Sequence, residues 1–109
     1  RRRPARPWTV ERLLAWYEGP SKELAPEDRA WPNSPRAAAI TLLLASRDVR
    51  GLRAAGAAID AGDDEVRIAA GMGIDTYWSD DLSAKMNLEM IMSSAMAWWD
   101  ANRDRYTSR

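Results

Sequence analysis

Apolar residues recur at helical spacing along most of this chain, and this periodicity limits the folds open to it. In the first such segment they fall at i, i+3, i+4 and i+7, on one face of a helix, at Val10, Leu13, Leu14 and Tyr17. Thr9 is a suitable N-cap residue, and Gly19-Pro20 ends the segment. The pattern predicts a helix over residues 9–18, followed by a proline-rich loop at 19–34.

A second helical segment is apolar around most of its circumference. Ser34 followed by Pro35 is an N-cap with proline at the first helical position. The residues that follow include one apolar stripe formed by Ile40, Leu43 and Leu44. The periodic pattern continues to Gly62, so we expect one central helix over residues 34–61 with a kink near Gly51, and a short helix over 63–71 capped by Asp63.

The C-terminal segment, residues 80–106, has two apolar faces when it is placed on an ideal helix. One face includes Leu88, Ile91, Met92, Trp98 and Trp99. The opposite face carries Leu82, Met86, Met90, Ala97 and Ala101. A helix with two apolar faces requires two packing partners, so we expect the first face to join the core and the second to contact a neighbouring protein.

These segments predict an all-α fold, a compact bundle of four to five helices, and none of them has the alternation typical of a strand. Residues 1–7 form an extended arm and residues 8–109 a single helical domain. A chain of 109 residues can bury about two thirds of its surface on folding. The expected core consists of Leu13, Leu14, Tyr17, Ile40, Leu43, Leu44, Leu88, Ile91, Met92, Trp98 and Trp99.

Two absent residue types restrict the chemistry of the chain. It has no Cys and no His, which removes thiolate nucleophiles, the usual zinc ligands and the commonest general base. The acidic group Asp60, Asp63, Asp64 and Glu65 lacks the alternating ligand spacing of a calcium loop and is better explained by helix capping. We therefore expect no catalytic residues, metal site or cofactor.

The formal net charge is zero, but it is distributed unevenly. Residues 1–53 carry 11 basic and 6 acidic side chains, whereas residues 54–109 carry 5 and 10. Arg1, Arg2, Arg3 and Arg6 lie among two prolines that prevent a helix, and Trp8 follows them. This arm can neutralise either an acidic protein surface or nucleic acid, and the sequence leaves both open.

These features predict a non-catalytic building block or adaptor subunit that forms a homo- or hetero-oligomer. A virion component (phage head, connector or tail) and an accessory subunit of an enzyme complex both suit the pattern. The alternatives are a small nucleic-acid-binding protein that uses the arm with Arg50 and Arg53, and an enzyme that uses only carboxylates. Runs without charge fall short of the roughly 20 residues of a membrane span, so we expect a soluble protein in the cytoplasm or in a particle.

Overall fold

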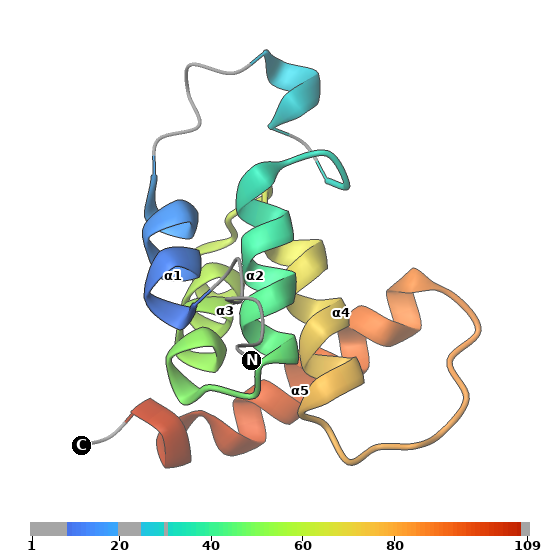
Figure 1. Cartoon of the computed structure of the whole chain (residues 1–109). Coiled ribbons are helices and arrows are strands. Elements are labelled where there is room, and N and C mark those ends of the chain that lie inside the picture. The colour runs from blue at the N-terminus through green and yellow to red at the C-terminus, as the bar shows by residue number, and fades with distance from the viewer. Residues whose placement is uncertain (1–8, 20–24, 30, 108–109) are drawn as a thin grey trace, which may run out of the picture.

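A computed structural model, which describes residues 9–19, 25–29 and 31–107, confirms the all-α class (Figure 1). Those ranges contain no strand. The helices are α1 (Val10–Glu18), the short 3-10 helix η1 (Pro26–Asp28), α2 (Pro35–Ala45), α3 (Val49–Ala61), α4 (Arg67–Tyr77) and α5 (Leu88–Thr107).

Helix α2 occupies the centre of the bundle and packs against α1, α3 and α4. Ile40, Leu43 and Leu44 on this helix are completely buried. Both predicted N-caps of this region are present, since the Thr9 hydroxyl accepts a hydrogen bond from Arg12 N and the Ser34 hydroxyl accepts one from Ala37 N. These caps satisfy backbone donors that the first turn of a helix leaves without partners.

The continuous helix expected over residues 34–61 is wrong, because the chain turns a corner between α2 and α3. Arg47, at the corner, has a φ of 63°, which is outside the helical region. The Ser46 hydroxyl donates to Leu43 O at 2.7 Å, and the Asp48 carboxylate accepts from Arg50 N at 2.8 Å. Side chains therefore satisfy the backbone groups that a continuous helix would pair internally.

The short helix expected over 63–71 is also misplaced, since α4 runs from Arg67 to Tyr77 and contains Gly71 and Gly73 in its interior. A Cβ atom at Gly71 would lie 2.4 Å from Met92 Sδ, and one at Gly73 would lie 2.4 Å from Leu44 Cδ1. These two glycines allow neighbouring side chains to approach α4 closely. They do not end the helix.

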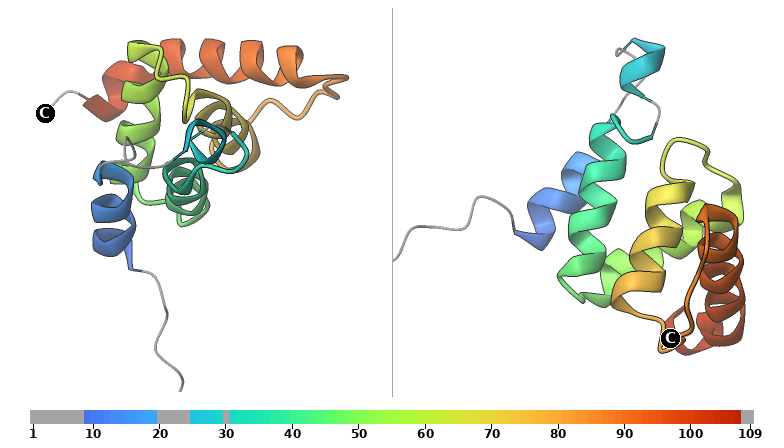
Figure 2. Two further views of the ribbon diagram at one scale, coloured as in Figure 1. Left: turned by 90° about the horizontal axis from the view of Figure 1, so that it is seen from above. Right: turned by 90° about the vertical axis from the view of Figure 1, so that its right-hand side faces the viewer.

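The last helix begins at Leu88 and not at Asp80, so Leu82 and Met86 belong to a connecting loop, residues 79–87. The Asn87 side-chain oxygen accepts a hydrogen bond from Met90 N at 2.9 Å and caps the first turn. Leu88 is 37% exposed, so its assignment to the core is wrong. Leu88 is the first residue of α5, and this end of the helix extends beyond α4 (Figure 2). The core therefore does not cover its side chain.

Candidate protein-association surface

The inner face of α5 is attached to the bundle through Trp99, which is 1% exposed. A Cβ atom at Gly56 of α3 would lie 2.0 Å from Trp99 Cζ2, so only glycine leaves room for the indole ring. The indole Nε1 donates to Asp60 Oδ2 at 3.3 Å. Hydrogen bonds from Arg103 lower the pKa of Asp60, and the Trp99 bond acts in the same direction. One side of α5 is thus fully occupied by the protein's own core.

The remaining residues of the expected core differ in how deeply they lie. Leu13 and Met92 are buried, as are the three α2 residues described above. Leu14, Tyr17, Ile91 and Trp98 are half-buried. The Trp98 ring lies 6.5 Å from the Trp78 ring and 6.1 Å from the Tyr106 ring, measured between centroids. This aromatic group lies where the C-terminal end of α4 meets α5.

The opposite side of α5 faces outward and carries apolar side chains that the bundle does not cover. We call Met90, Ser93, Ala97 and Ala101 on α5, together with Met86 at the end of the preceding loop, the Met/Ala face. Met86 is 82% exposed, Met90 is 42% exposed, and the other three are also exposed. Figure 2 shows α5 as an outer layer along one side of the other helices. The five residues that the sequence predicted to contact a partner are all exposed: Leu82, Met86, Met90, Ala97 and Ala101.

Loop 79–87, which presents Leu82 and Met86, is held by polar contacts. Lys85 Nζ lies 3.2 Å from Asp75 Oδ1 on α4 and donates to Asp81 O at 2.8 Å. The Asp81 carboxylate accepts from the Ser83 hydroxyl at 2.7 Å and from Ser94 Oγ on α5 at 3.1 Å. These hydrogen bonds, chiefly those from Ser83, lower the pKa of Asp81 to about 2. The loop is thereby tied to both α4 and α5.

Sequence reasoning missed a polar network centred on Arg36. Its guanidinium donates to Tyr17 O at 2.8 Å, to Glu65 Oε1 at 3.1 Å and to Asp63 Oδ2 at 3.1 Å. The buried Ser34 hydroxyl donates to the other oxygen of Glu65. The network joins α1, α2 and the α3–α4 connection. The capping role expected for Asp63 is wrong, because the N-cap of α4 is Val66 and no side chain caps this helix. Asp63 and Glu65 instead hold three parts of the fold together.

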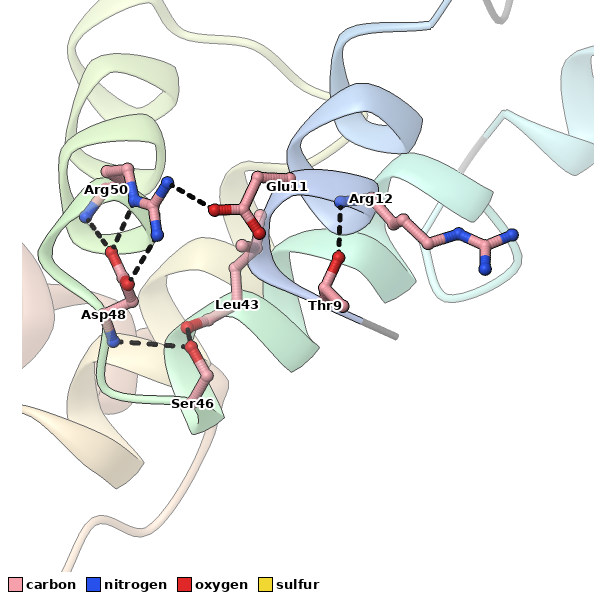
Figure 3. A network of polar contacts seen from close by, with 7 residues as sticks. All are labelled: Thr9, Glu11, Arg12, Leu43, Ser46, Asp48 and Arg50. Carbon is pink, nitrogen blue, oxygen red and sulfur yellow. Dashed lines mark hydrogen bonds and ion pairs between the residues drawn. The ribbon is translucent and has the colours of Figure 1, made fainter. Parts of the chain in front are cut away.

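The internal arginines of the nucleic-acid hypothesis are bonded within the protein. Arg50 lies 3.0 Å from an Asp48 carboxylate oxygen and 3.2 Å from Glu11 Oε2, which links α3 to α1 (Figure 3). Arg53 Nε donates to Tyr106 O. The other members of that hypothesis, Arg1, Arg2, Arg3, Arg6 and Trp8, lie outside the described residues.

A cavity of about 170 Å³ lies between α2 and α4. It is lined by Trp31, Thr41, Ala69, Met72, Gly73, Thr76 and Tyr77. This lining offers hydroxyl groups but no carboxylate or amine. Across residues 9–19, 25–29 and 31–107, no group of three or more acidic side chains is placed to hold a metal ion. None of the helices in those ranges is long and apolar enough to cross a membrane.

No protein-family model matches the chain, and comparisons with curated proteins and with solved structures find no similar protein. A function for this protein is therefore inferred from its own residues and their arrangement.

Proposed function

We propose that this protein is a non-catalytic subunit of a larger protein assembly, which it joins through the Met/Ala face and through Leu82 of the loop before α5. The observation that carries the proposal is the exposure of large apolar side chains on one helix and its preceding loop. Leu82 is 94% exposed, and the methionines beside it are accessible. Contiguous exposed apolar surface on a small protein is characteristic of interaction sites.

The residue types on this face suit protein association. Methionine is unbranched and polarisable, so it adapts to the shape of a partner surface. Ala97 and Ala101 leave little side chain above the α5 backbone, which allows another helix to approach closely. Met96, also 42% exposed, widens the apolar surface along one edge, although it was not part of the expected partner face. Burial of these groups against a partner would supply hydrophobic free energy for association.

The arrangement of the polar residues also supports a structural role. Three partly buried carboxylates, Asp63, Asp75 and Glu65, each contact an arginine or lysine, and so does the exposed Asp60. Ser34, the buried hydroxyl, is occupied as an N-cap and as a donor to Glu65. A nucleophile needs a neighbouring base and access to a substrate, and this serine has neither space nor a free base beside it.

The proposal is tested by the native mass of the protein in an extract of the cells that produce it. We expect the tagged chain to elute well above its 12.2 kDa mass and a Met90→Asp variant to elute as a monomer. The new carboxylate would have no partner in a dry contact, so it should prevent association. Within the monomer it lies at the third residue of α5, where a negative charge interacts favourably with the helix dipole. At protein concentrations low enough for both chains to be monomeric, Met90→Asp should therefore melt at the same temperature as the wild-type chain.

The matched control is Ala57→Asp, which places the same charge on an exposed position of α3. It should elute with the wild-type chain. The proposal is overturned if the wild-type chain elutes as a monomer in the extract and also stays monomeric when it is purified and concentrated, or if both aspartate variants change the native mass equally.

A further inference from the structure

We propose that the partner of the Met/Ala face is a second copy of this chain, with the two α5 helices packed antiparallel about a two-fold axis that passes between Ser93 and Ser94. This inference rests on the proposed function and names its partner. Dimers with two-fold symmetry are the commonest protein oligomers, and their interfaces must be complementary to themselves. The Met/Ala face meets this requirement in both side-chain size and charge.

The first argument is the size of the side chains along the face. Its large residues, Met86 and Met90, lie on the N-terminal side of Ser93, and its small residues, Ala97 and Ala101, lie on the C-terminal side. Rotation about the proposed axis places Met90 opposite Ala97 of the second copy. Met90 of each copy then has space above an alanine of the other, so the two helices interdigitate on both sides of the axis.

The second argument is the charge beside the face. The carboxylates of Glu89, Asp100 and Asp104 flank it on α5. The antiparallel arrangement places Glu89 opposite Trp98 of the second copy and Asp100 opposite Asn87, which caps the second α5, and both of those positions are uncharged. Asp104 then lies beyond the start of the second α5 helix. A parallel arrangement in register would place each carboxylate against its own copy, and such like-charge contacts are unfavourable. The opposed helix dipoles also favour the antiparallel pair.

The extent of the contact sets the expected affinity. Helix α5 has 20 residues and is about 30 Å long. A single pair of helices buries less surface than the roughly 800 Å² per partner of a standard interface, so we expect a dissociation constant on the order of micromolar. The isolated chain should thus change from monomer to dimer over an accessible concentration range.

Paired charges test the register directly. In sedimentation velocity, the single variants Met90→Glu and Ala97→Lys should each weaken dimerisation at least tenfold, because each places an unpaired charge in the contact. In the double variant, the antiparallel register places each glutamate opposite a lysine of the second copy, so dimerisation should recover. A parallel dimer would instead oppose like charges in the double variant, and association would not recover.

A single introduced cysteine tests the position of the axis. The chain has no cysteine of its own. With helix axes about 8 Å apart, the two copies of Ser93 lie within the separation that a disulfide spans. Under diamide oxidation, Ser93→Cys should therefore form a covalent dimer at least tenfold faster than Ala57→Cys, an exposed control on α3.

The outcomes separate this inference from the proposed function. A purified chain that stays monomeric at every concentration, with equal cross-linking of the two cysteine variants, overturns the second copy as partner. The proposed function then still holds if the chain is part of a larger species in the cell extract, and the occupant of the face is a different protein. Rapid cross-linking of Ser93→Cys without charge rescue overturns the antiparallel register.

Discussion

At the scale of single residues, the absence of a side chain at Gly56 determines how α5 attaches to α3. We expect Gly56→Ala to lower the free energy of unfolding by about 1–3 kcal/mol, because the new methyl group would overlap the Trp99 ring. Urea denaturation measures this loss. Combining it with Trp99→Phe should cost less than the sum of the two single changes, since the smaller ring relieves the overlap. Strict additivity would contradict this account of the contact.

Asp81 provides a second prediction at this scale, concerning pH. Its pKa is lowered to about 2 from the ordinary value of 3.8, so the charged form is favoured in the folded protein. A lowered pKa stabilises the fold above the ordinary value, and this contribution is lost as the pH falls through the folded pKa. Loop 79–87 should therefore keep its hydrogen bonds at pH 4 and lose them towards pH 2.

Carboxyl chemical shifts measured by NMR across that pH range give the pKa of Asp81 directly. Removing the strongest donor, by Ser83→Ala, should move the pKa back towards its ordinary value. An unchanged pKa in this variant would show that Ser83 is not the main cause of the shift.

At the scale of elements, the sequence predicted helices well where a cap and a periodic pattern coincide. Thr9 and Ser34 start α1 and α2 as expected, because an N-cap acts on backbone groups only a few residues away. The break between α2 and α3 also has a local signal, since Asp48 caps α3, but the uninterrupted apolar pattern obscured it.

The errors in the predicted bounds of α4 and α5 have different causes. Glycine can end a helix or make room for a neighbour, and Gly71 and Gly73 do the latter because Met92 and Leu44 pack against them. Asp80 and Asp81 resemble the start of a helix, yet Asn87 caps α5. Local sequence could not decide the role of the glycines, because the deciding contacts join residues far apart in the chain. The Asn87 cap is a local signal, three residues from Met90, and the two aspartates obscured it.

Lys85 connects loop 79–87 to Asp75 on α4, and we predict that this ion pair stabilises the fold. Lys85→Met should lower the free energy of unfolding by about 1–3 kcal/mol, because it leaves the largely buried Asp75 carboxylate without its ion pair. Thermal or urea denaturation measures the loss. A second change, Asp75→Asn, should restore part of the stability in the Lys85→Met background, and a further loss would contradict the proposed pairing.

At the scale of the whole molecule, association and folding should be coupled. If the folded chain dimerises, its melting temperature should rise with protein concentration, because mass action favours the associated folded state. Calorimetry over a hundredfold concentration range tests this. The melting temperature of Met90→Asp should not depend on concentration, and an equal dependence in both proteins would contradict the role of the Met/Ala face.

The candidate surface was accessible to sequence reasoning because angular position on a helix follows from spacing alone. Met90, Ala97 and Ala101 are exposed on α5 as expected, whereas Leu82 and Met86 are exposed on the loop that precedes it. The network of Arg36 was not accessible, since Asp63 and Glu65 lie 27 and 29 residues away from it along the chain. Nothing in local sequence indicates such a pairing.

The extension of α5 beyond α4 also has a kinetic consequence. The core contacts of this helix begin at Met92, so the turn that starts at Leu88 can open without disturbing the bundle. Its amide protons should exchange with deuterated solvent far faster than those around Trp99, whose release requires much larger unfolding. If the chain dimerises through the Met/Ala face, Met90 is covered, and exchange in this turn should slow. The same short segment would then report, residue by residue, how much of the protein is associated.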